Sequence, residues 1–224
     1  MSAPAACLFD LDGLLLDTEP LHSLAWRQAA ERFGLQLPDA DLMRLRGRRR
    51  LDNARQVITW IAERVGAPPT VEELLAVQQP IARGLLPRAE PMEGAPELLR
   101  QCRQRQVAMA LVTSSSRESL ALKTAGHPWL ELIELRIDGD DPALKAGKPA
   151  PDPFLLAAER LGVSPGDCWA FEDSPAGAFA AAAAGCRVHV LVPPGLTPQE
   201  RQRLYPGDWI FLDSLRDLAF EQHD

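Results

Sequence analysis

Short apolar runs alternate along the chain with longer segments whose apolar residues recur at helical spacing. This alternation is typical of a parallel sheet whose two faces are covered by helices. It predicts six strands, at residues 5–10, 107–113, 132–137, 168–171, 187–192 and 209–212. It also predicts helices at 95–104, 116–125, 153–161 and 175–184, with Ser116 and Ser174 as N-caps of the second and fourth.

The rhythm is interrupted between the first predicted strand and residue 107, where no strand pattern is found. Helical patterns occupy residues 20–33, 51–65 and 71–83, with chain breakers between them. A simple strand–helix–strand crossover needs far fewer residues. We therefore expect an all-α domain at 17–86, inserted into an α/β core formed by 1–16 and 87–224. That core is expected to be Rossmann-like, with three layers and a mostly parallel sheet.

The composition of the chain is acidic. The 224 residues include 24 Lys and Arg against 31 Asp and Glu, a net charge of −7. That balance argues against nucleic acid as a partner, because phosphate contacts require a basic face. One local feature departs from the average, since five arginines crowd into a short stretch: Arg44, Arg46, Arg48, Arg49 and Arg50.

The chain carries no signal for a membrane or for an oxidising compartment. It contains no run of about eighteen apolar residues, and no basic stretch precedes the first apolar run. The four cysteines are scattered without a CxxC pair, so we expect buried free thiols rather than disulfides or zinc ligands. These features predict a cytoplasmic protein without a membrane partner.

The first predicted strand ends in two carboxylates, Asp10 and Asp12, followed by Gly13. Ligands of open parallel sheets bind beyond the carboxyl ends of the strands, so the pair is a candidate for chemistry. A polar strand end followed by a turn is the alternative. A calcium loop of the EF-hand type is excluded, because its first acidic position would fall on Leu8.

Polar groups also follow two other predicted strands. Hydroxyls at 113–116 stand before a helix, where they suit a phosphate or serve only as caps. Glu172 and Asp173 precede another capped helix, where they could hold Mg²⁺ or simply favour the helix dipole. Lys148 lies in a proline-stiffened loop, and a lone loop lysine is usually solvated. Together, however, these groups supply what phosphoryl transfer through an aspartyl phosphate requires.

Four segments resemble, in order, the four motifs of the haloacid dehalogenase superfamily: DLDGLLLDTE, SSS within LVTSSSR, GKPAPDPF and FEDSPAG. The resemblance extends over nearly the whole chain and is closest to the β-phosphoglucomutase-like and pseudouridine-phosphate phosphatases, which carry a helical cap after the first strand. It implies that Asp10 attacks phosphorus, while Asp12 protonates the leaving alkoxide and then deprotonates water. It also implies a Mg²⁺ site made of Asp10, the Asp12 carbonyl and Asp173, with Glu172 as a further ligand or a partner of the ligands.

The same resemblance implies that Ser114, the Ser115 amide and Lys148 bind the phosphoryl oxygens. In the inserted cap, His22 and Arg50 match positions that face substrate in the mutases. A helix-surface histidine and a solvated arginine-rich turn are the alternatives for these two.

The last predicted cap helix, LLAVQQPIARGLL, lacks the lysine that mutases normally carry there, although Arg83 could replace it. Hydrolysis of a small phosphorylated metabolite is therefore the preferred interpretation, and the resemblance implies a monomer. A phosphosugar mutase is the first alternative. A non-catalytic binding relative and a true dehalogenase fit the intact set of acids and lysine less well.

Trp26 and Trp60 are interpreted as core residues of the cap.

Overall fold

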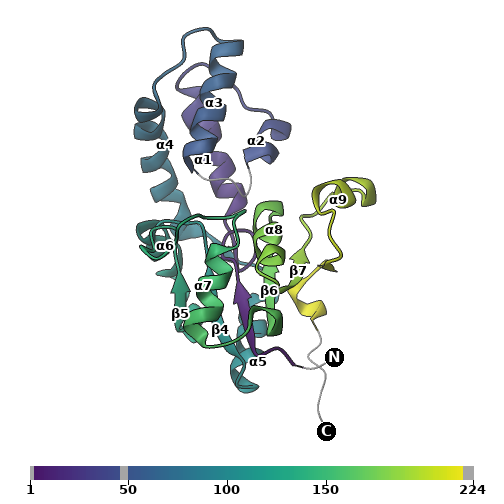
Figure 1. Ribbon diagram of the computed structural model, residues 1–224. Coiled ribbons are helices and arrows are strands. Elements are labelled where there is room, and N and C mark those ends of the chain that lie inside the picture. The colour runs from purple at the N-terminus through teal and green to yellow at the C-terminus, as the bar shows by residue number, and fades with distance from the viewer. Residues whose placement is uncertain (1–2, 46–49, 219–224) are drawn as a thin grey trace. The chain divides into compact units, whose positions relative to one another are not determined.

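A computed structural model describes residues 3–45 and 50–218, and it divides into two compact units (Figure 1). We call the described residues up to Asp17 and from Glu90 onward the α/β unit, and Thr18–Ala89 the helical unit. Of the arginine-rich stretch, Arg46, Arg48 and Arg49 lie outside the described residues.

The α/β unit contains the six predicted strands in one parallel sheet, in the order β5-β4-β1-β6-β7-β8. Their bounds are β1 (Ala6–Phe9), β4 (Ala108–Val112), β5 (Leu135–Ile137), β6 (Cys168–Glu172), β7 (Arg187–Leu191) and β8 (Ile210–Leu212). The central strands β1, β4 and β6 are almost entirely buried, as expected for strands covered on both faces. The predicted Rossmann-like sheet is confirmed.

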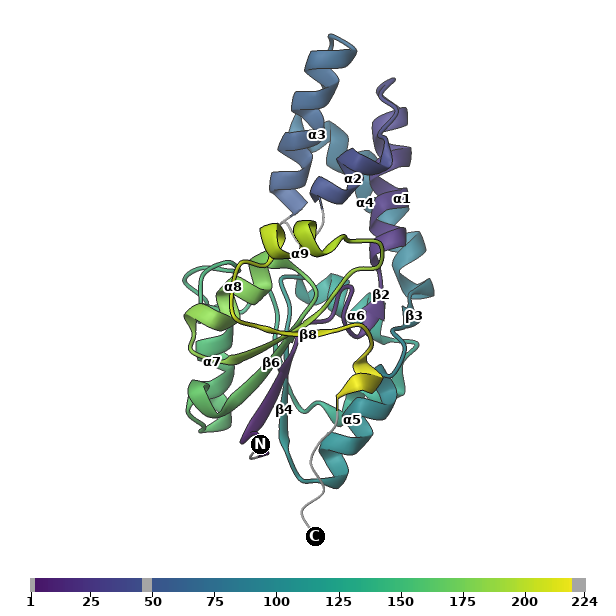
Figure 2. The same ribbon diagram turned by 90° about the vertical axis from the view of Figure 1, so that its right-hand side faces the viewer.

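Helices cover both faces of this sheet, which gives the expected three layers (Figure 2). On one face α7 (Asp152–Leu161) and α8 (Pro175–Ala183) pack over alternate strand residues such as Leu8 and Ala170. On the other side lie α5 (Ala95–Gln104) and α6 (Arg117–Thr124). All four cysteines are buried free thiols of this unit, as predicted.

Several short elements were not predicted from the sequence, and the seven-residue helix α2 (Asp39–Leu45) is one of them. β2 (Leu16–Asp17) and β3 (Glu90–Pro91) form an antiparallel pair, so the expectation of no strand between the first strand and residue 107 was wrong. A two-residue strand is too short to show an alternating pattern. The helix α9 (Pro198–Leu204) was also missed, because it is polar and lacks a single buried residue.

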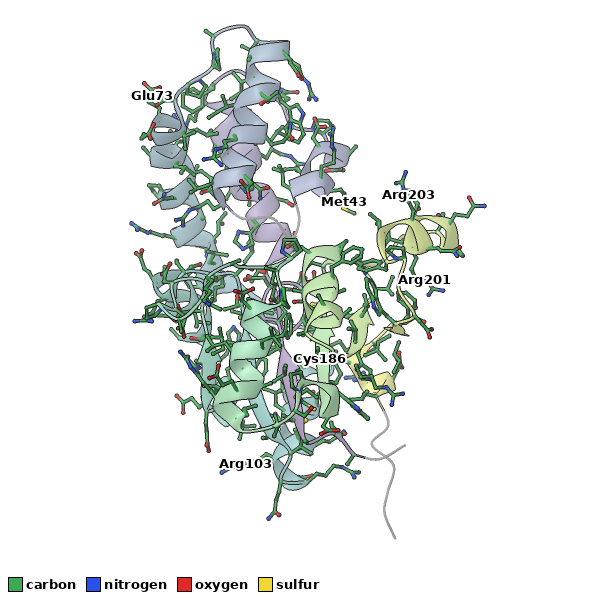
Figure 3. The ribbon with its side chains drawn as sticks, in the orientation of Figure 1. Met43, Glu73, Arg103, Cys186, Arg201 and Arg203 are labelled. Carbon is green, nitrogen blue, oxygen red and sulfur yellow. The ribbon has the colours of Figure 1, made fainter. Side chains whose placement is uncertain are left out.

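The helical unit consists of α1 (Glu19–Glu31), α2 (Asp39–Leu45), α3 (Arg50–Arg64) and α4 (Val71–Leu85). Trp26 and Trp60 are buried in its core, which confirms their predicted role. A capping box begins α4, in which the Thr70 hydroxyl accepts from the Glu73 amide and the Glu73 carboxylate accepts from the Thr70 amide (Figure 3 labels Glu73). Among the described residues, no helix combines the length and apolar character needed to cross a membrane.

Candidate active site

Three neighbouring parallel strands end at the same edge of the sheet and bring the predicted site residues together. Asp10 follows β1, and its amide donates to the carbonyl of Phe171 in β6 at 3.0 Å. Thr113 follows β4 on the other side of β1, and Glu172 is the last residue of β6. The strand order therefore places the carboxylates and the hydroxyl loop around Asp10, as the rule for parallel sheets predicts.

Lys148 is the cation at the centre of this cluster. Its side chain is 4% exposed, and its Nζ donates to Asp10 Oδ1 at 2.5 Å, to Glu172 Oε1 at 2.5 Å and to the Val112 carbonyl at 2.8 Å. Burial acts to lower the pKa of Lys148, but the Asp10 and Glu172 carboxylates outweigh it and raise this pKa above its ordinary value. The lysine is therefore held as a cation against the candidate nucleophile.

The carboxyl group of Asp10 is crowded by its surroundings. The pKa of Asp10 is raised to about 7, chiefly by burial. The carboxylates of Glu172 and Asp12 contribute to the rise, and Lys148 acts against it. An additional cation beside Asp10 would stabilise its ionised form and so lower its pKa.

The donor set fits a hard divalent cation. Asp10, Glu172 and Asp173 each offer a carboxylate oxygen, and these three oxygens lie within 4.8 Å of one another. Oxygen donors of this kind are those that Mg²⁺ and Ca²⁺ prefer. The six buried or half-buried ionic side chains of the site, Asp10, Asp12, Glu172, Asp173, Lys123 and Lys148, leave two negative charges unbalanced when all are ionised.

Two glycines make room for these carboxylates. A Cβ atom on Gly13, whose φ is +82°, would lie 2.1 Å from Asp173 Oδ2. A Cβ atom on Gly177 would lie 1.9 Å from Glu172 Oε1. The turn after β1 and the first turn of α8 therefore require glycine so that the acidic side chains can occupy their places.

Asp12 belongs to a second ionic cluster beside the first. Lys123, on α6, donates to both Asp12 oxygens at 2.6 and 2.7 Å and to Ser115 Oγ at 2.7 Å. Ser115 Oγ in turn donates to Asp12 Oδ2 at 2.8 Å. Both oxygens of Asp12 accept hydrogen bonds in this arrangement.

The remaining predicted site residues are placed as follows. Ser114 is exposed in the loop after β4, whereas the amide of Ser115 donates to the Thr113 hydroxyl at 3.1 Å. His22 is a half-buried residue of α1, and Arg50 is the exposed first residue of α3. Both belong to the helical unit, and their contact with substrate stays a prediction.

Two residues of the site were missed in the sequence. Lys123, on α6, was not among the predicted site residues. Tyr205, whose hydroxyl donates to the Asp173 carbonyl, follows α9, where no sequence pattern marks it. A signal for Lys123 exists in the composition. The chain has 24 basic residues, of which only Lys123, Lys145 and Lys148 are lysines. In a chain that uses arginine as its general cation, each lysine marks a position worth testing.

The parallel sheet, the acids at its strand ends and the buried Lys148 define a Rossmann-like α/β protein with an ionic cluster at the carboxyl edge of the sheet. The chain belongs to the haloacid dehalogenase-like hydrolase family, whose model matches residues 4–185. The resemblance seen in the four motifs is thereby confirmed.

Individual relatives agree with this assignment. A Drosophila melanogaster protein named "Probable pseudouridine-5'-phosphatase" is 39% identical over 199 residues, which cover 87% of this chain and 84% of the relative. A Mycobacterium bovis protein named "Beta-phosphoglucomutase" is 34% identical over 210 residues, covering 83% and 79%. The crystal structure of a Deinococcus radiodurans hydrolase of the same family, with bound phosphate and sodium, is 30% identical with a TM-score of 0.75, covering 96% of this chain and 94% of that one.

Proposed function

We propose that this enzyme is a Mg²⁺-dependent phosphatase that hydrolyses a small phosphate monoester through an aspartyl phosphate on Asp10. The observation that carries the proposal is the contact of Asp10 with Lys148, at 2.5 Å, beside the acidic cluster of Asp10, Glu172 and Asp173. A carboxylate nucleophile and a phosphate repel each other, and cations on both sides remove that repulsion.

In the first step an Asp10 carboxylate oxygen forms a bond to phosphorus, and the bond from phosphorus to the alkoxide oxygen breaks. The alkoxide takes a proton from Asp12 and leaves as an alcohol. In the second step Asp12 takes a proton from water while the water oxygen bonds to phosphorus. The bond from phosphorus to Asp10 breaks, so that inorganic phosphate leaves, the Asp10 carboxylate is restored and Asp12 is again protonated.

Asp10, the Asp12 carbonyl and Asp173 are proposed to hold Mg²⁺, with Glu172 as a further ligand or as the partner that orients Lys148. When bound, the ion supplies charge neutralisation at the phosphoryl oxygens. Ser114, the Ser115 amide and Lys148 are proposed to bind those oxygens, and His22 and Arg50 to contact the substrate from the helical unit. Residues 17–86 would then act as the cap domain, and residues 1–16 and 87–224 as the core that holds the chemistry.

The proposed substrate is a small phosphorylated metabolite such as a sugar phosphate, handled in the cytoplasm by a monomer. The phosphatase named among the relatives supports hydrolysis. The mutase is kept as a second candidate because a relative with that name is 34% identical. The two activities differ in product, since a mutase returns a phosphorylated isomer and a phosphatase releases inorganic phosphate.

The test measures phosphate release from p-nitrophenyl phosphate and from a panel of metabolite phosphates, with and without Mg²⁺. We expect Asp10→Asn to abolish Mg²⁺-dependent release without loss of folded structure by circular dichroism. The matched control is Asp208→Asn, a change at an exposed acid of the same unit. Substantial turnover by purified Asp10→Asn would refute the assignment of the nucleophile. Isomerisation of β-glucose 1-phosphate in the presence of a bisphosphate activator, without net phosphate release, would favour the mutase.

A further inference from the structure

The side chain of Lys123 is buried and fully engaged within one small cluster. It is 1% exposed, and its ammonium group donates to Asp12 Oδ1, Asp12 Oδ2 and Ser115 Oγ at 2.6 to 2.7 Å. An ammonium group has three N–H donors, so all three are used inside this cluster. Because Ser115 Oγ also donates to Asp12 Oδ2, the three side chains form a closed ring of hydrogen bonds.

Lys123 and Asp12, the two charged members of this ring, differ in how firmly the fold holds them. Lys123 lies one turn after the buried Leu120 on α6, and the Ser116 hydroxyl caps that helix by accepting from the Ser119 amide at 3.3 Å. Helix packing therefore sets the place of Lys123. Asp12 follows the end of β1, and its side chain is 20% exposed. The ring therefore joins a partly exposed carboxylate to a lysine that is held by a packed helix.

We propose that Lys123 is a positioning residue that fixes the Asp12 carboxylate in the orientation from which it exchanges protons with the leaving group and with water. The proposal rests on the function proposed above. The two buried lysines then have separate tasks, because Lys148 contacts the nucleophile Asp10 and Lys123 contacts the acid and base Asp12. Placement of the proton donor matters because a displacement of about 1 Å in a reacting group can slow catalysis about 100-fold.

The kinetic test uses Lys123→Met, which removes the ammonium group but keeps a long apolar side chain. Its matched control is Lys145→Met, at an exposed lysine of the same unit. The variants are compared on p-nitrophenyl phosphate, whose leaving group departs without a proton, and on glycerol 3-phosphate, whose alkoxide needs one. We expect kcat/KM of Lys123→Met to fall about 100-fold or more on glycerol 3-phosphate but less than about tenfold on p-nitrophenyl phosphate. In an Asp12→Asn background, Lys123→Met should add no further selective loss.

Equal losses on both substrates would overturn the proposal, because a merely structural role does not distinguish leaving groups. A selective loss that persists in the Asp12→Asn background would overturn it as well. If Lys123→Met does not fold, Ser115→Ala removes one bond of the same ring without removing a charge, and it should give a smaller loss of the same selectivity. An unselective effect of Ser115→Ala would contradict the proposal.

A crystal structure of Lys123→Met, or of Ser115→Ala if the former does not fold, tests positioning independently of activity. We expect the Asp12 side chain to rotate or to occupy more than one conformer while Asp10 keeps its place. A single unchanged Asp12 conformer would refute the proposal. Absence of phosphate release by the wild-type chain would instead refute the proposed function, and the crystal structure would still decide whether Lys123 orients Asp12.

Discussion

His189 on β7 is expected to make the α/β unit lose stability in acid. Its side chain is buried, and its ring is stacked on that of Phe171, its register partner on β6, at 4.8 Å. Phe171 is in turn stacked on Phe9 of β1 at 4.9 Å. The pKa of His189 is lowered to about 4, chiefly by burial and also by the charge of Arg187. The backbone of Arg187 and of Ala170 acts in the opposite direction, because hydrogen bonding to it favours the charged ring.

The sign and size of the effect follow from the difference between the folded and unfolded states. An unfolded histidine titrates near 6.5, so between pH 6.5 and 4 the unfolded chain binds more protons than the folded one. The free energy of unfolding therefore has its full value above pH 6.5 and falls as the pH is lowered toward 4. The total loss from this group is about 3 kcal/mol, of which about 1.4 kcal/mol is gone by pH 5.5.

The assay is urea unfolding at pH 7.5, 5.5 and 4.5, followed by hydrogen exchange of peptides from β6 and β7. These pH values lie on both sides of about 6.5, the pKa of an unfolded histidine. The wild type is compared with His189→Phe, which keeps a ring for stacking, and with His189→Gln, which keeps polarity but does not titrate. Other groups that titrate in this range cancel in the difference between wild type and variant. Both variants should lose less stability than the wild type on acidification. Parallel losses in all three proteins would refute the reasoning.

Two changes near the acidic cluster give further predictions. Gly177→Ala places a Cβ atom within 2.0 Å of the Glu172 carboxylate, so we expect weaker Mg²⁺ activation and a stability loss of about 1–3 kcal/mol, measured by Mg²⁺ titration of phosphate release and by urea unfolding. The matched control is Gly126→Ala, where nothing lies within 4 Å, and equal behaviour of the two variants would contradict the steric argument. Tyr205→Phe removes the donor to the Asp173 carbonyl and should raise the Mg²⁺ concentration needed for half-maximal activity, with a stability loss of about 1 kcal/mol. An unchanged Mg²⁺ titration would show that this hydrogen bond does not support the metal ligands.

The sheet could be predicted from sequence because its strands are buried on both faces. Such strands appear as continuous apolar runs between breakers, and each of the six runs is found as a strand. The β2–β3 pair could not be found in this way, because its two-residue strands depend on contacts between distant parts of the chain. The polar helix α9 shows the same limit, since a helix without a buried face has no apolar period to detect.

The part of the candidate site that could be predicted is the part whose side chains are brought together by the strand order alone. Asp10 and Glu172 lie at the ends of neighbouring parallel strands, and Lys148 precedes a helix at the same edge of the sheet. Because ligands of such sheets bind at the carboxyl ends of the strands, the three residues are expected to lie close together. Tyr205 approaches Asp173 across the fold, and no local pattern encodes that approach. Helical spacing alone does not distinguish Lys123 from a solvated lysine, because it places a residue on a face of the helix without showing what that face contacts. The scarcity of lysine in the composition is the one sequence feature that marks it.

The use of lysine in this chain is explained by the geometry of the two ionic clusters. The chain has 21 arginines, yet among the described residues lysines donate the hydrogen bonds to the Asp10 and Asp12 carboxylates that the structure identifies from a cationic side chain. Lys148 reaches two carboxylates and a carbonyl, and Lys123 reaches both oxygens of one carboxylate and a hydroxyl. An ammonium group can direct three donors to such converging acceptors in a small volume, whereas a planar guanidinium needs more room and offers its donors in one plane. Arginine at position 123 would therefore keep the charge but lose the ring, so charge alone does not explain why lysine occupies these two positions.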